Sequence, residues 1–376
     1  MKRLIVIGFL LLLSCNKKQT VHNRFEQQVD TVSTSYAKGF SILNYKNFQL
    51  LKIQSFKDSV HTLYTYLLAK PHAKVPRSIK YDYKLQIPIQ TLVATSTTHI
   101  PPLVALGEEK SLVGFPHLDY ISSPEIRERI SQHKITELGE NENINFELLL
   151  SLQPDLLMGF SIDQHSGYKN ISQVGIPILY NMDWREESPL GKAEWIKVYG
   201  ALFDKTERAE HIFKKIETDY QSAKELVPDG IKRPEVLSGA LYRDVWYVPG
   251  GESWSARLID DAGGAYVYEN LKNTESVALS FESVFNTAKD ADIWINPSYF
   301  SDLEEMKNKS KHYLQFKAFQ KKHIYNYTSK KGATGGMLYF EYGPSRPDLI
   351  LKDLIHIFHP ELLPKNYKPS FYQALK

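Results

Sequence analysis

The sequence predicts an α/β protein with two lobes joined by one long helical segment. Short apolar runs bounded by turn residues alternate with longer amphipathic stretches, a rhythm typical of parallel β-sheets covered by helices. The expected strands lie at residues 91–95, 112–115, 155–158 and 176–180 in one half, and at residues 235–237, 292–295 and 323–325 in the other. The length is consistent with two lobes, because 376 residues suffice for two domains, each with its own hydrophobic core.

The segment between the two sets of strands, residues 191–227, is predicted to be helical. Its second part carries apolar residues three and four positions apart, while charged residues take the opposite face. These apolar residues are Ala209, Ile212, Phe213, Ile216, Tyr220, Ala223 and Val227. Asp204 and Glu207 have the spacing of a capping pair, which would divide the segment into two helices. We therefore place an N-terminal lobe at residues 36–190 and a C-terminal lobe at residues 228–376.

The first residues predict secretion and a lipid anchor. A basic start is followed by an apolar run over Leu4–Leu13, which is shorter than the about 20 residues that a membrane span requires. Ser14 before Cys15 resembles the lipobox of bacterial lipoproteins. The resemblance implies that residues 1–14 are a signal peptide and that Cys15, the single cysteine, carries acyl chains. The polar residues 15–35 are then a tether, which places the protein in the periplasm or cell envelope on a membrane.

Composition and motifs exclude several classes of function. The chain has 46 Lys+Arg against 43 Asp+Glu, so no basic excess favours nucleic acid. One cysteine excludes an internal disulfide and thiolate-rich metal sites. The sequence lacks the Gly-x-Ser-x-Gly, His-Glu-x-x-His and phosphate-loop motifs of common enzymes. His356, His359 and Glu361 have the spacing of metal ligands, but beside Pro360 we interpret them as surface residues.

Two helical stretches begin in the same way. Asn145-Phe146-Glu147 and Ser280-Phe281-Glu282 each open an apolar helical stretch that leads to a strand. Asn145 and Ser280 are good N-caps, and a carboxylate in the first turn interacts favourably with the helix dipole. A favourable interaction with the helix dipole can therefore explain both glutamates. The alternative is that they contact a partner protein at the surface.

The order of motifs along both halves resembles the periplasmic iron-chelate and cobalamin-binding proteins of ABC importers. In the first half the resemblance rests on residues 103–107, 112–115, 137–139, 146–147 and 152–157, and in the second on residues 251–264, 279–282 and 290–295. It covers about residues 87–361. Residues 40–84 make a longer N-terminal segment than the family usually carries, and the loop Gly332–Gly336 has no assignment.

This resemblance implies a fold and a function. The fold is like that of class III periplasmic binding proteins, with two Rossmann-like α/β lobes joined by a single long helix and a shallow ligand cleft between the lobes. The function is capture of a small-molecule metal chelate and its delivery to the transmembrane subunits of an ABC permease, with Glu147 and Glu282 docking on permease arginines. We expect a monomer that is not an enzyme, with no cofactor or metal site of its own.

Candidates for the cleft are aromatic, cationic and histidine side chains that follow the expected strands. Open α/β sheets bind ligands at the carboxyl ends of their strands, and aromatic walls with a few cations suit iron chelates, corrinoids and haem. The candidates are Phe115, His117, Tyr120, Trp184, Tyr242, Arg243, Trp246, Tyr247, Trp254, Tyr339, Tyr342 and Arg346. The alternative for each tyrosine is packing in the core, because the chain contains 23 of them.

A ferric siderophore is the first expectation for the cargo. It is the commonest cargo of the family that the chain resembles, and Arg243 and Arg346 suit an anionic chelate. Cobalamin is the second, since a corrin ring needs no opposing charge. Haem needs an axial tyrosine or histidine, which His117, Tyr120, Tyr242 and Tyr247 offer.

Two alternatives belong to other classes of protein. An envelope lipoprotein hydrolase would show a Ser–His–carboxylate arrangement in its cleft. An accessory lipoprotein that binds another envelope protein would have the inter-lobe groove filled by side chains.

Overall fold

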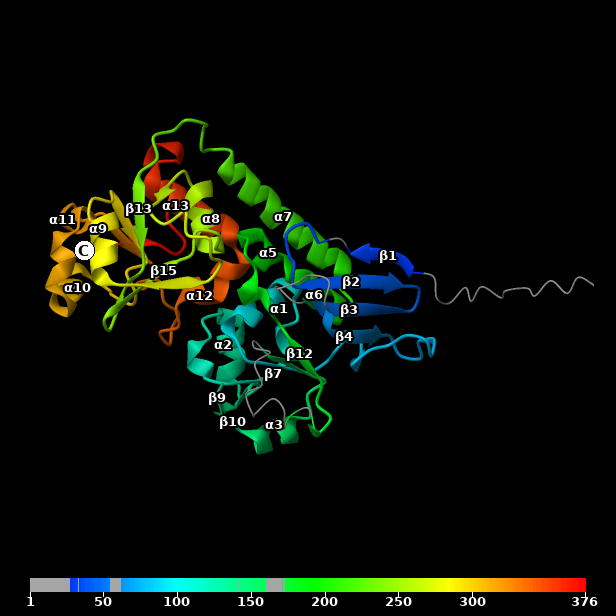
Figure 1. Cartoon of the computed structure of the whole chain (residues 1–376). Coiled ribbons are helices and arrows are strands. Elements are labelled where there is room, and N and C mark those ends of the chain that lie inside the picture. The colour runs from blue at the N-terminus through cyan, green and yellow to red at the C-terminus, as the bar shows by residue number, and fades with distance from the viewer. Residues whose placement is uncertain (1–27, 33, 55–61, 142, 160–170, 172) are drawn as a thin grey trace, which may run out of the picture.

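The computed structural model describes residues 28–376 apart from residues 33, 55–61, 142, 160–170 and 172. The expected signal peptide, Cys15 and the first part of the tether lie outside the described residues. Figure 1 shows two α/β lobes and, beside the first, a separate sheet made by the N-terminal strands. Within the described part of the chain, no helix is both long and apolar enough to cross a membrane.

The first lobe is built on a sheet of parallel strands. Its strands are β6 (Leu92–Ala94), β7 (Leu112–Phe115), β8 (Thr136–Glu137), β11 (Leu156–Gly159) and β12 (Ile178–Tyr180), in the order β12-β11-β6-β7-β8. The helices α1 (Ile100–Leu106), α2 (Pro124–Ser131) and α3 (Phe146–Leu152) connect them, and β9 (Gly139–Glu140) and β10 (Asn143–Ile144) form a small hairpin. All four strands expected in this half are confirmed.

The second lobe repeats this plan. Its main sheet contains β13 (Glu235–Ser238), β16 (Ala265–Tyr266), β18 (Ile293–Ile295), β19 (Ile324–Asn326) and β20 (Gln373–Ala374), in the order β16-β13-β18-β19-β20. The first four strands run parallel and β20 pairs with β19 in the antiparallel sense. The three strands expected here are confirmed.

Further elements complete the second lobe. Its helices are α8 (Trp254–Asp261), α9 (Phe281–Ala288), α10 (Leu303–Lys309), α11 (Lys317–Gln320), α12 (Leu338–Tyr342) and α13 (Pro347–Phe358). A smaller antiparallel sheet, β14 (Ala240–Tyr242), β15 (Val245–Pro249) and β17 (Ser276–Leu279), lies next to them.

The connecting segment consists of α5 (Pro189–Glu194), α6 (Ile196–Leu202) and the longest helix, α7 (Thr206–Lys224). As predicted, α7 buries one apolar face through Ala209, Phe213, Ile216, Tyr220 and Ala223. It contacts α1 of the first lobe and α13 of the second, so it bridges the lobes (Figure 1).

The predicted break in this segment is present, but its mechanism differs from the prediction. The α7 N-cap is Lys205, and no side chain caps the helix. Asp204 has a φ of +55° and forms an ion pair with Lys70 at 2.6 Å. A left-handed residue, rather than a capping pair, therefore divides the helices.

The N-terminal strands form a sheet of their own, which corrects two expected boundaries. The strands β1 (Gln28–Val32), β2 (Phe40–Tyr45), β3 (Phe48–Gln54), β4 (Thr62–Ala69) and β5 (Tyr83–Gln86) pair in sequence order. The lobe expected at residues 36–190 therefore contains two sheets. The strand β1, expected in the tether, belongs to the fold because it pairs with β2.

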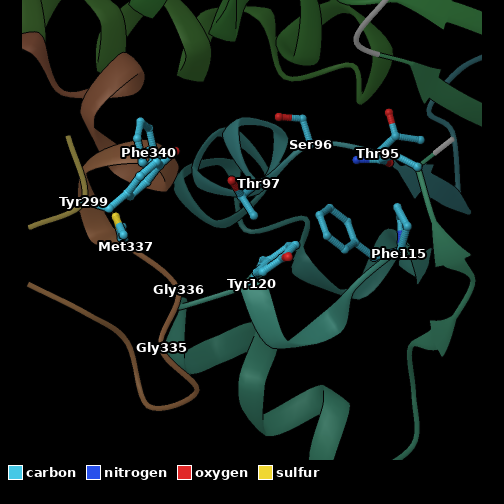
Figure 2. A pocket seen from close by; sticks show the side chains of 12 residues that line it. Thr95, Ser96, Thr97, Phe115, Tyr120, Tyr299, Gly335, Gly336, Met337 and Phe340 are labelled. Atoms are coloured by element: carbon cyan, nitrogen blue, oxygen red, sulfur yellow. The ribbon is translucent and has the colours of Figure 1, made fainter. Parts of the chain in front are cut away.

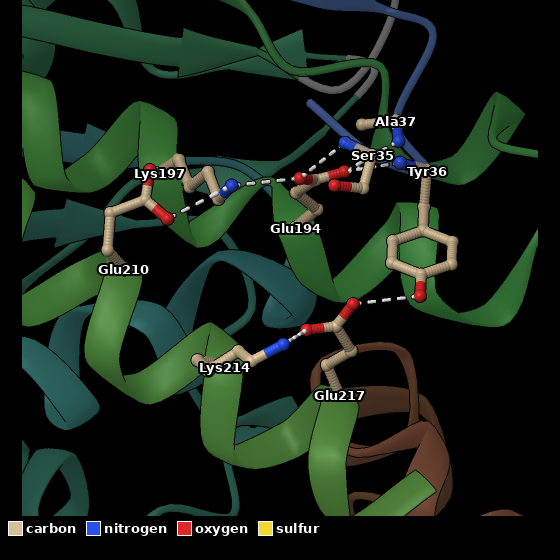
Figure 3. A network of polar contacts seen from close by, with 8 residues as sticks. All are labelled: Ser35, Tyr36, Ala37, Glu194, Lys197, Glu210, Lys214 and Glu217. Carbon is tan, nitrogen blue, oxygen red and sulfur yellow. Dashed lines mark hydrogen bonds and ion pairs between the residues drawn. The ribbon is translucent and has the colours of Figure 1, made fainter. Parts of the chain in front are cut away.

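Two buried glutamates attach the chain after β1 to the rest of the fold: Glu194 on α5, which Figure 3 shows, and Glu186, which precedes this helix. The Glu194 carboxylate accepts hydrogen bonds from the backbone N–H groups of Ser35, Tyr36 and Ala37 at 2.8–2.9 Å, and forms an ion pair with Lys197 at 2.9 Å. Glu186 accepts from the N–H groups of the next two residues, 38 and 39. Because buried charges must be paired and hydrogen-bonded, these contacts fix the loop between β1 and β2.

Candidate ligand-binding cleft

A cavity of about 480 Å³ lies between the two lobes (Figure 2). Most of its described lining residues are uncharged polar groups, aromatic rings and glycines. They are Thr95, Ser96, Thr97, Phe115, Pro116, Tyr120, Asn141, Tyr299, Gly335, Gly336, Met337 and Phe340. We call this cavity the cleft.

The cleft lies where both main sheets end. Residues 95–97 follow β6, Phe115 is the last residue of β7, and Tyr299 comes after β18. Residues 335–337 belong to the loop between β19 and α12. The carboxyl ends of parallel strands thus meet across the cleft, which is the usual place for a ligand in open α/β sheets.

Aromatic rings from both lobes face the cleft. Tyr120 of the first lobe is 59% exposed, and Tyr299 and Phe340 of the second are 65% and 41% exposed. The rings of Tyr299 and Phe340 contact each other, with centroids 6.5 Å apart. Exposed aromatic side chains gathered in one hollow are typical of a ligand-binding surface.

The polar groups of the cleft are neutral. Ser96 Oγ accepts a hydrogen bond from the Thr98 N–H at 3.3 Å, and Thr95 Oγ1 donates to the Met158 carbonyl at 3.1 Å. Asn141 Oδ1 is buried and has no hydrogen-bond partner among the described residues. None of the described lining residues carries a formal charge. The cleft therefore presents hydrogen-bonding groups and aromatic surface, and no charged side chain of the described lining.

The loop Gly332–Gly336, which the sequence left unassigned, forms part of the cleft wall. It lies against the first lobe so closely that a Cβ at Gly336 would collide with the Tyr120 carbonyl oxygen. A Cβ at Gly332 would lie 2.5 Å from that of Ser122. Thr334 Oγ1 also donates a hydrogen bond to the Asp119 carbonyl oxygen at 2.7 Å. Glycine is needed here for close approach between the lobes.

Of the candidate residues, Phe115 and Tyr120 lie in the cleft. His117 is close to it, with its ring centroid 5.0 Å from that of Tyr120 and a backbone φ of +53°.

Trp184 and Trp254 line a second cavity between the lobes, of about 350 Å³. Arg185 reaches across it to Glu275 at 3.4 Å. Lys192 is buried and contacts both tryptophans, through the Trp254 ring and the Trp184 carbonyl oxygen. Burial lowers the pKa of its ammonium group to about 8.

Trp246 does not belong to the cleft, and its expected role there is wrong. It is fully buried in the second lobe, where it stacks on Trp294 with centroids 5.3 Å apart and packs against Tyr313 and Phe316. Alternation along β15 explains this, because successive side chains point to opposite faces of a strand. Its neighbour Tyr247 is exposed.

The other candidates also lie away from the cleft lining. Tyr242 and Tyr247 are exposed on the β14–β15 hairpin, and Arg243 lies at the turn between these strands, over the ring of Tyr242. Tyr339 is buried and stacks on Tyr327. Tyr342 and Arg346 line a third cavity, of about 320 Å³, between α1, α7 and the segment before α13.

The arginines therefore do not support an anionic cargo. Arg346 forms two hydrogen bonds with the buried Asp348 carboxylate, at 2.8 and 2.9 Å. Arg243 is not among the described lining residues of the cleft.

We expected both histidines near the C-terminus on the surface, but only one of them is partly exposed. His359 is buried, and its Nε2 lies 3.0 Å from the Gly263 carbonyl oxygen. The ring of His356 packs against Tyr367. Among the described residues, no group of three or more His, Cys, Asp and Glu side chains is arranged to hold a metal ion.

Several residues of the cleft were not among those expected from the sequence: Thr95, Ser96, Thr97, Asn141, Tyr299 and Met337. The signal for some of them was present, because residues 95–97 and Tyr299 follow strands that were correctly predicted. Restricting the search to aromatic, cationic and histidine side chains excluded the hydroxyl groups. Asn141, on the β9–β10 hairpin, gave no comparable signal.

Glu147 and Glu282 both begin helices, as predicted. Asn145 Oδ1 caps α3 and Ser280 Oγ caps α9. Both glutamates are exposed in the first helical turn, one on each lobe, and neither forms an ion pair with a described residue.

The sequence model of the periplasmic binding protein family matches residues 92–330, from the first residue of β6 to just beyond β19 of the second lobe. The chain belongs to this family, the iron-chelate and cobalamin group of periplasmic binding proteins. Members of this family are solute-binding proteins, not enzymes. They bind small ligands and work with ABC permeases. The N-terminal sheet lies before the matched region.

Similar proteins agree with this fold. An uncharacterized lipoprotein of Methanocaldococcus jannaschii is 24% identical over 99% of this chain and 96% of its own length. A possible iron-binding periplasmic solute-binding protein of Staphylococcus epidermidis has 18% identity and a TM-score of 0.57, covering 72% of this chain and 98% of that one. A periplasmic heme-binding protein of Pseudomonas aeruginosa has 16% identity and a TM-score of 0.58, covering 77% and 98%. These structures confirm the two-lobed fold.

Proposed function

We propose that this protein is the membrane-anchored solute-binding component of an ABC importer and that it captures a metal chelate in the cleft between its lobes. The observation that carries this proposal is the cleft itself. Exposed aromatic rings from both lobes and uncharged polar groups face a cavity of about 480 Å³ at the carboxyl ends of both sheets. Membership of a solute-binding family supports it.

The cargo that fits this lining best is an electroneutral ferric siderophore, such as a ferric hydroxamate. Tyr120, Tyr299 and Phe340 offer flat apolar surface, and the Asn141 amide and the hydroxyls of Ser96 and Thr97 offer hydrogen bonds. A strongly anionic ferric catecholate would be desolvated there without an opposing charge from the described lining, which is costly. Cobalamin, whose corrin ring needs no opposing charge, remains the second candidate.

Haem is a third candidate, supported by a separate observation. Tyr120 lines the cleft and the His117 ring lies beside it, so either could approach a haem iron from the first lobe. The relative from Pseudomonas aeruginosa is described as a heme-binding protein.

Delivery to the permease would use the two exposed glutamates. Glu147 on α3 and Glu282 on α9 mark one position on each lobe, and two charges far apart define the orientation of docking. Exposed ion pairs contribute little affinity each, which suits repeated docking and release. Acyl chains on Cys15 would keep the protein at the membrane.

A binding titration tests the proposal. The purified full-length protein, in detergent, is titrated with ferrichrome, ferric enterobactin, haem and cyanocobalamin while tryptophan fluorescence is corrected for absorbance by the ligand. We expect saturable quenching at submicromolar ferrichrome and weaker binding of ferric enterobactin. Tighter binding of ferric enterobactin would contradict the neutral-cargo assignment, and no binding of any chelate to folded protein would contradict the proposed function.

A further inference from the structure

A buried carboxylate crosses from the second lobe to the first beside the cleft. Glu341, on α12, is 1% exposed. Its Oε2 accepts a hydrogen bond from the Ser122 N–H at 2.5 Å, and its Oε1 accepts from the Ser123 N–H at 3.0 Å. Ser123 is the N-cap of α2, so the carboxylate faces the start of a first-lobe helix.

The same first-lobe turn holds the glycine loop of the second lobe. Ser122 Oγ donates a hydrogen bond to the Gly336 carbonyl oxygen at 3.1 Å. Gly336 also packs on the Tyr120 backbone, where a side chain would not fit. Residues 120–123 are therefore bound twice by the second lobe, through Glu341 and through the loop Gly332–Gly336.

Glu341 does not have the contacts of an ordinary stabilising ion pair. It forms no salt bridge with a described residue, and Glu125, which accepts from Ser123 Oγ at 2.8 Å, is another carboxylate whose charge raises the pKa of Glu341. Burying a carboxylate without a cation is costly, and the two N–H donors offset only part of that cost. Added stability is therefore a poor explanation for a carboxylate at this position.

We propose that Glu341 is a positioning residue for cargo binding, which locks the Tyr120–Ser123 turn to the loop Gly332–Gly336 and so holds the cleft wall in its binding geometry. The expected effect of this lock is slow release of cargo, and this part of the inference rests on the proposed function. Tyr120, Gly336 and Phe340 all line the cleft, and Phe340 is the residue before Glu341. A loose wall would present the same side chains at varying distances and shorten the residence time.

Hydrogen exchange of the full-length protein without ligand tests the lock. In Glu341→Ala we expect the amides of Ser122 and Ser123 to exchange about tenfold faster or more, and the amides of residues 332–336 to accelerate with them. Glu341→Gln keeps one acceptor and is expected to fall between the wild type and Glu341→Ala. Glu125→Gln, which changes the neighbouring carboxylate on the same serine, is the control and should leave both segments unchanged. Faster exchange at residues 122 and 123 alone would overturn the proposal, since a local bond would not couple the two lobes.

Dissociation rates of cargo provide the second test. With ferrichrome, haem and cyanocobalamin as probes, we expect Glu341→Ala to release whichever probe the wild type binds about tenfold faster, and Glu125→Gln to release it at the wild-type rate. An unchanged rate in Glu341→Ala, with faster exchange in both segments, would overturn the role in positioning. If the wild type binds no probe, the proposed function fails, while hydrogen exchange still decides whether Glu341 couples the lobes.

Discussion

The ammonium group of Lys192 lies 5.0 Å from the ring centre of Trp254, so a cation on the connecting helix α5 contacts an aromatic ring of the second lobe. The same Nζ donates hydrogen bonds to the carbonyl oxygens of Asp183 and Trp184, both at 3.0 Å. One buried cation therefore joins both tryptophans of the second inter-lobe cavity. Cation–π contacts of this kind are strongest where water is excluded.

Burial of Lys192 predicts a pH dependence of stability. Burial is the main cause that lowers the pKa of Lys192 to about 8, while Asp183 and Glu186 raise it. As the pH rises, the folded chain therefore loses this proton at a lower pH than the unfolded chain does. Between about pH 8 and 10.5 the unfolded state binds more protons, so the stability of the wild type should rise relative to Lys192→Met. The slope is at most about 1.4 kcal/mol per pH unit.

Urea unfolding of both proteins at intervals over this range measures the difference. Other titrating groups, including the tyrosines, are common to both proteins and cancel. A difference that stays constant from pH 8 to 10.5 would contradict the lowered pKa.

Replacing Trp246 should destabilise the second lobe rather than remove a ligand contact. Trp246→Ala takes a fully buried ring from the cluster with Trp294, Tyr313 and Phe316, and we expect a loss of about 3–5 kcal/mol in the free energy of unfolding. Tyr247→Ala, one residue along the same strand and 46% exposed, is the control and should change stability by less than about 0.5 kcal/mol. Equal effects of the two substitutions in urea unfolding would be inconsistent with the burial of Trp246.

Replacing Tyr120 should weaken cargo binding without affecting the fold. Tyr120 is 59% exposed in the cleft, and Tyr242, 61% exposed on the β14–β15 hairpin, is a matched control. We expect Tyr120→Ala to raise the Kd for the bound chelate about tenfold or more and Tyr242→Ala to leave it unchanged. Calorimetric titration measures both. A larger effect at Tyr242 would place the ligand at the hairpin instead of the cleft.

Much of the fold could be predicted because strands and helices depend on local patterns. All seven expected strands of the two lobes are present, and α7 buries the apolar face that its spacing predicted. The separate N-terminal sheet could not be predicted, because which strands pair depends on distant contacts. Its attachment through Glu186 and Glu194 joins residues about 150 positions apart in the sequence.

The cleft was harder to predict for a related reason. The rule that ligands bind at strand ends pointed to Phe115, the last residue of β7, and to Tyr120 shortly after it, and both line the cleft. It did not distinguish Trp246, which is buried by alternation along β15, or Arg346, whose partner Asp348 is two residues away. Composition identified suitable side chains, but only the packing between the lobes decides which of them face the cleft.

Removal of both exposed glutamates should separate cargo binding from transport. Glu147→Ala combined with Glu282→Ala leaves the cleft untouched, so we expect an unchanged Kd for the bound chelate and lower uptake of that chelate by cells. The control replaces Glu304 and Glu305, exposed acidic residues in the first turn of α10, with alanine. Uptake at the wild-type rate in the first double variant would show that docking uses another surface.

The most direct test of the account is the position of the metal in a complex. Crystals of the protein grown with ferrichrome, measured at the iron absorption edge, locate the iron by its anomalous scattering. We predict one iron peak in the cleft, between Tyr120 of the first lobe and Tyr299 and Phe340 of the second. A peak beside Trp184 and Trp254, or at the β14–β15 hairpin, would contradict it, and so would a saturated complex with an empty cleft.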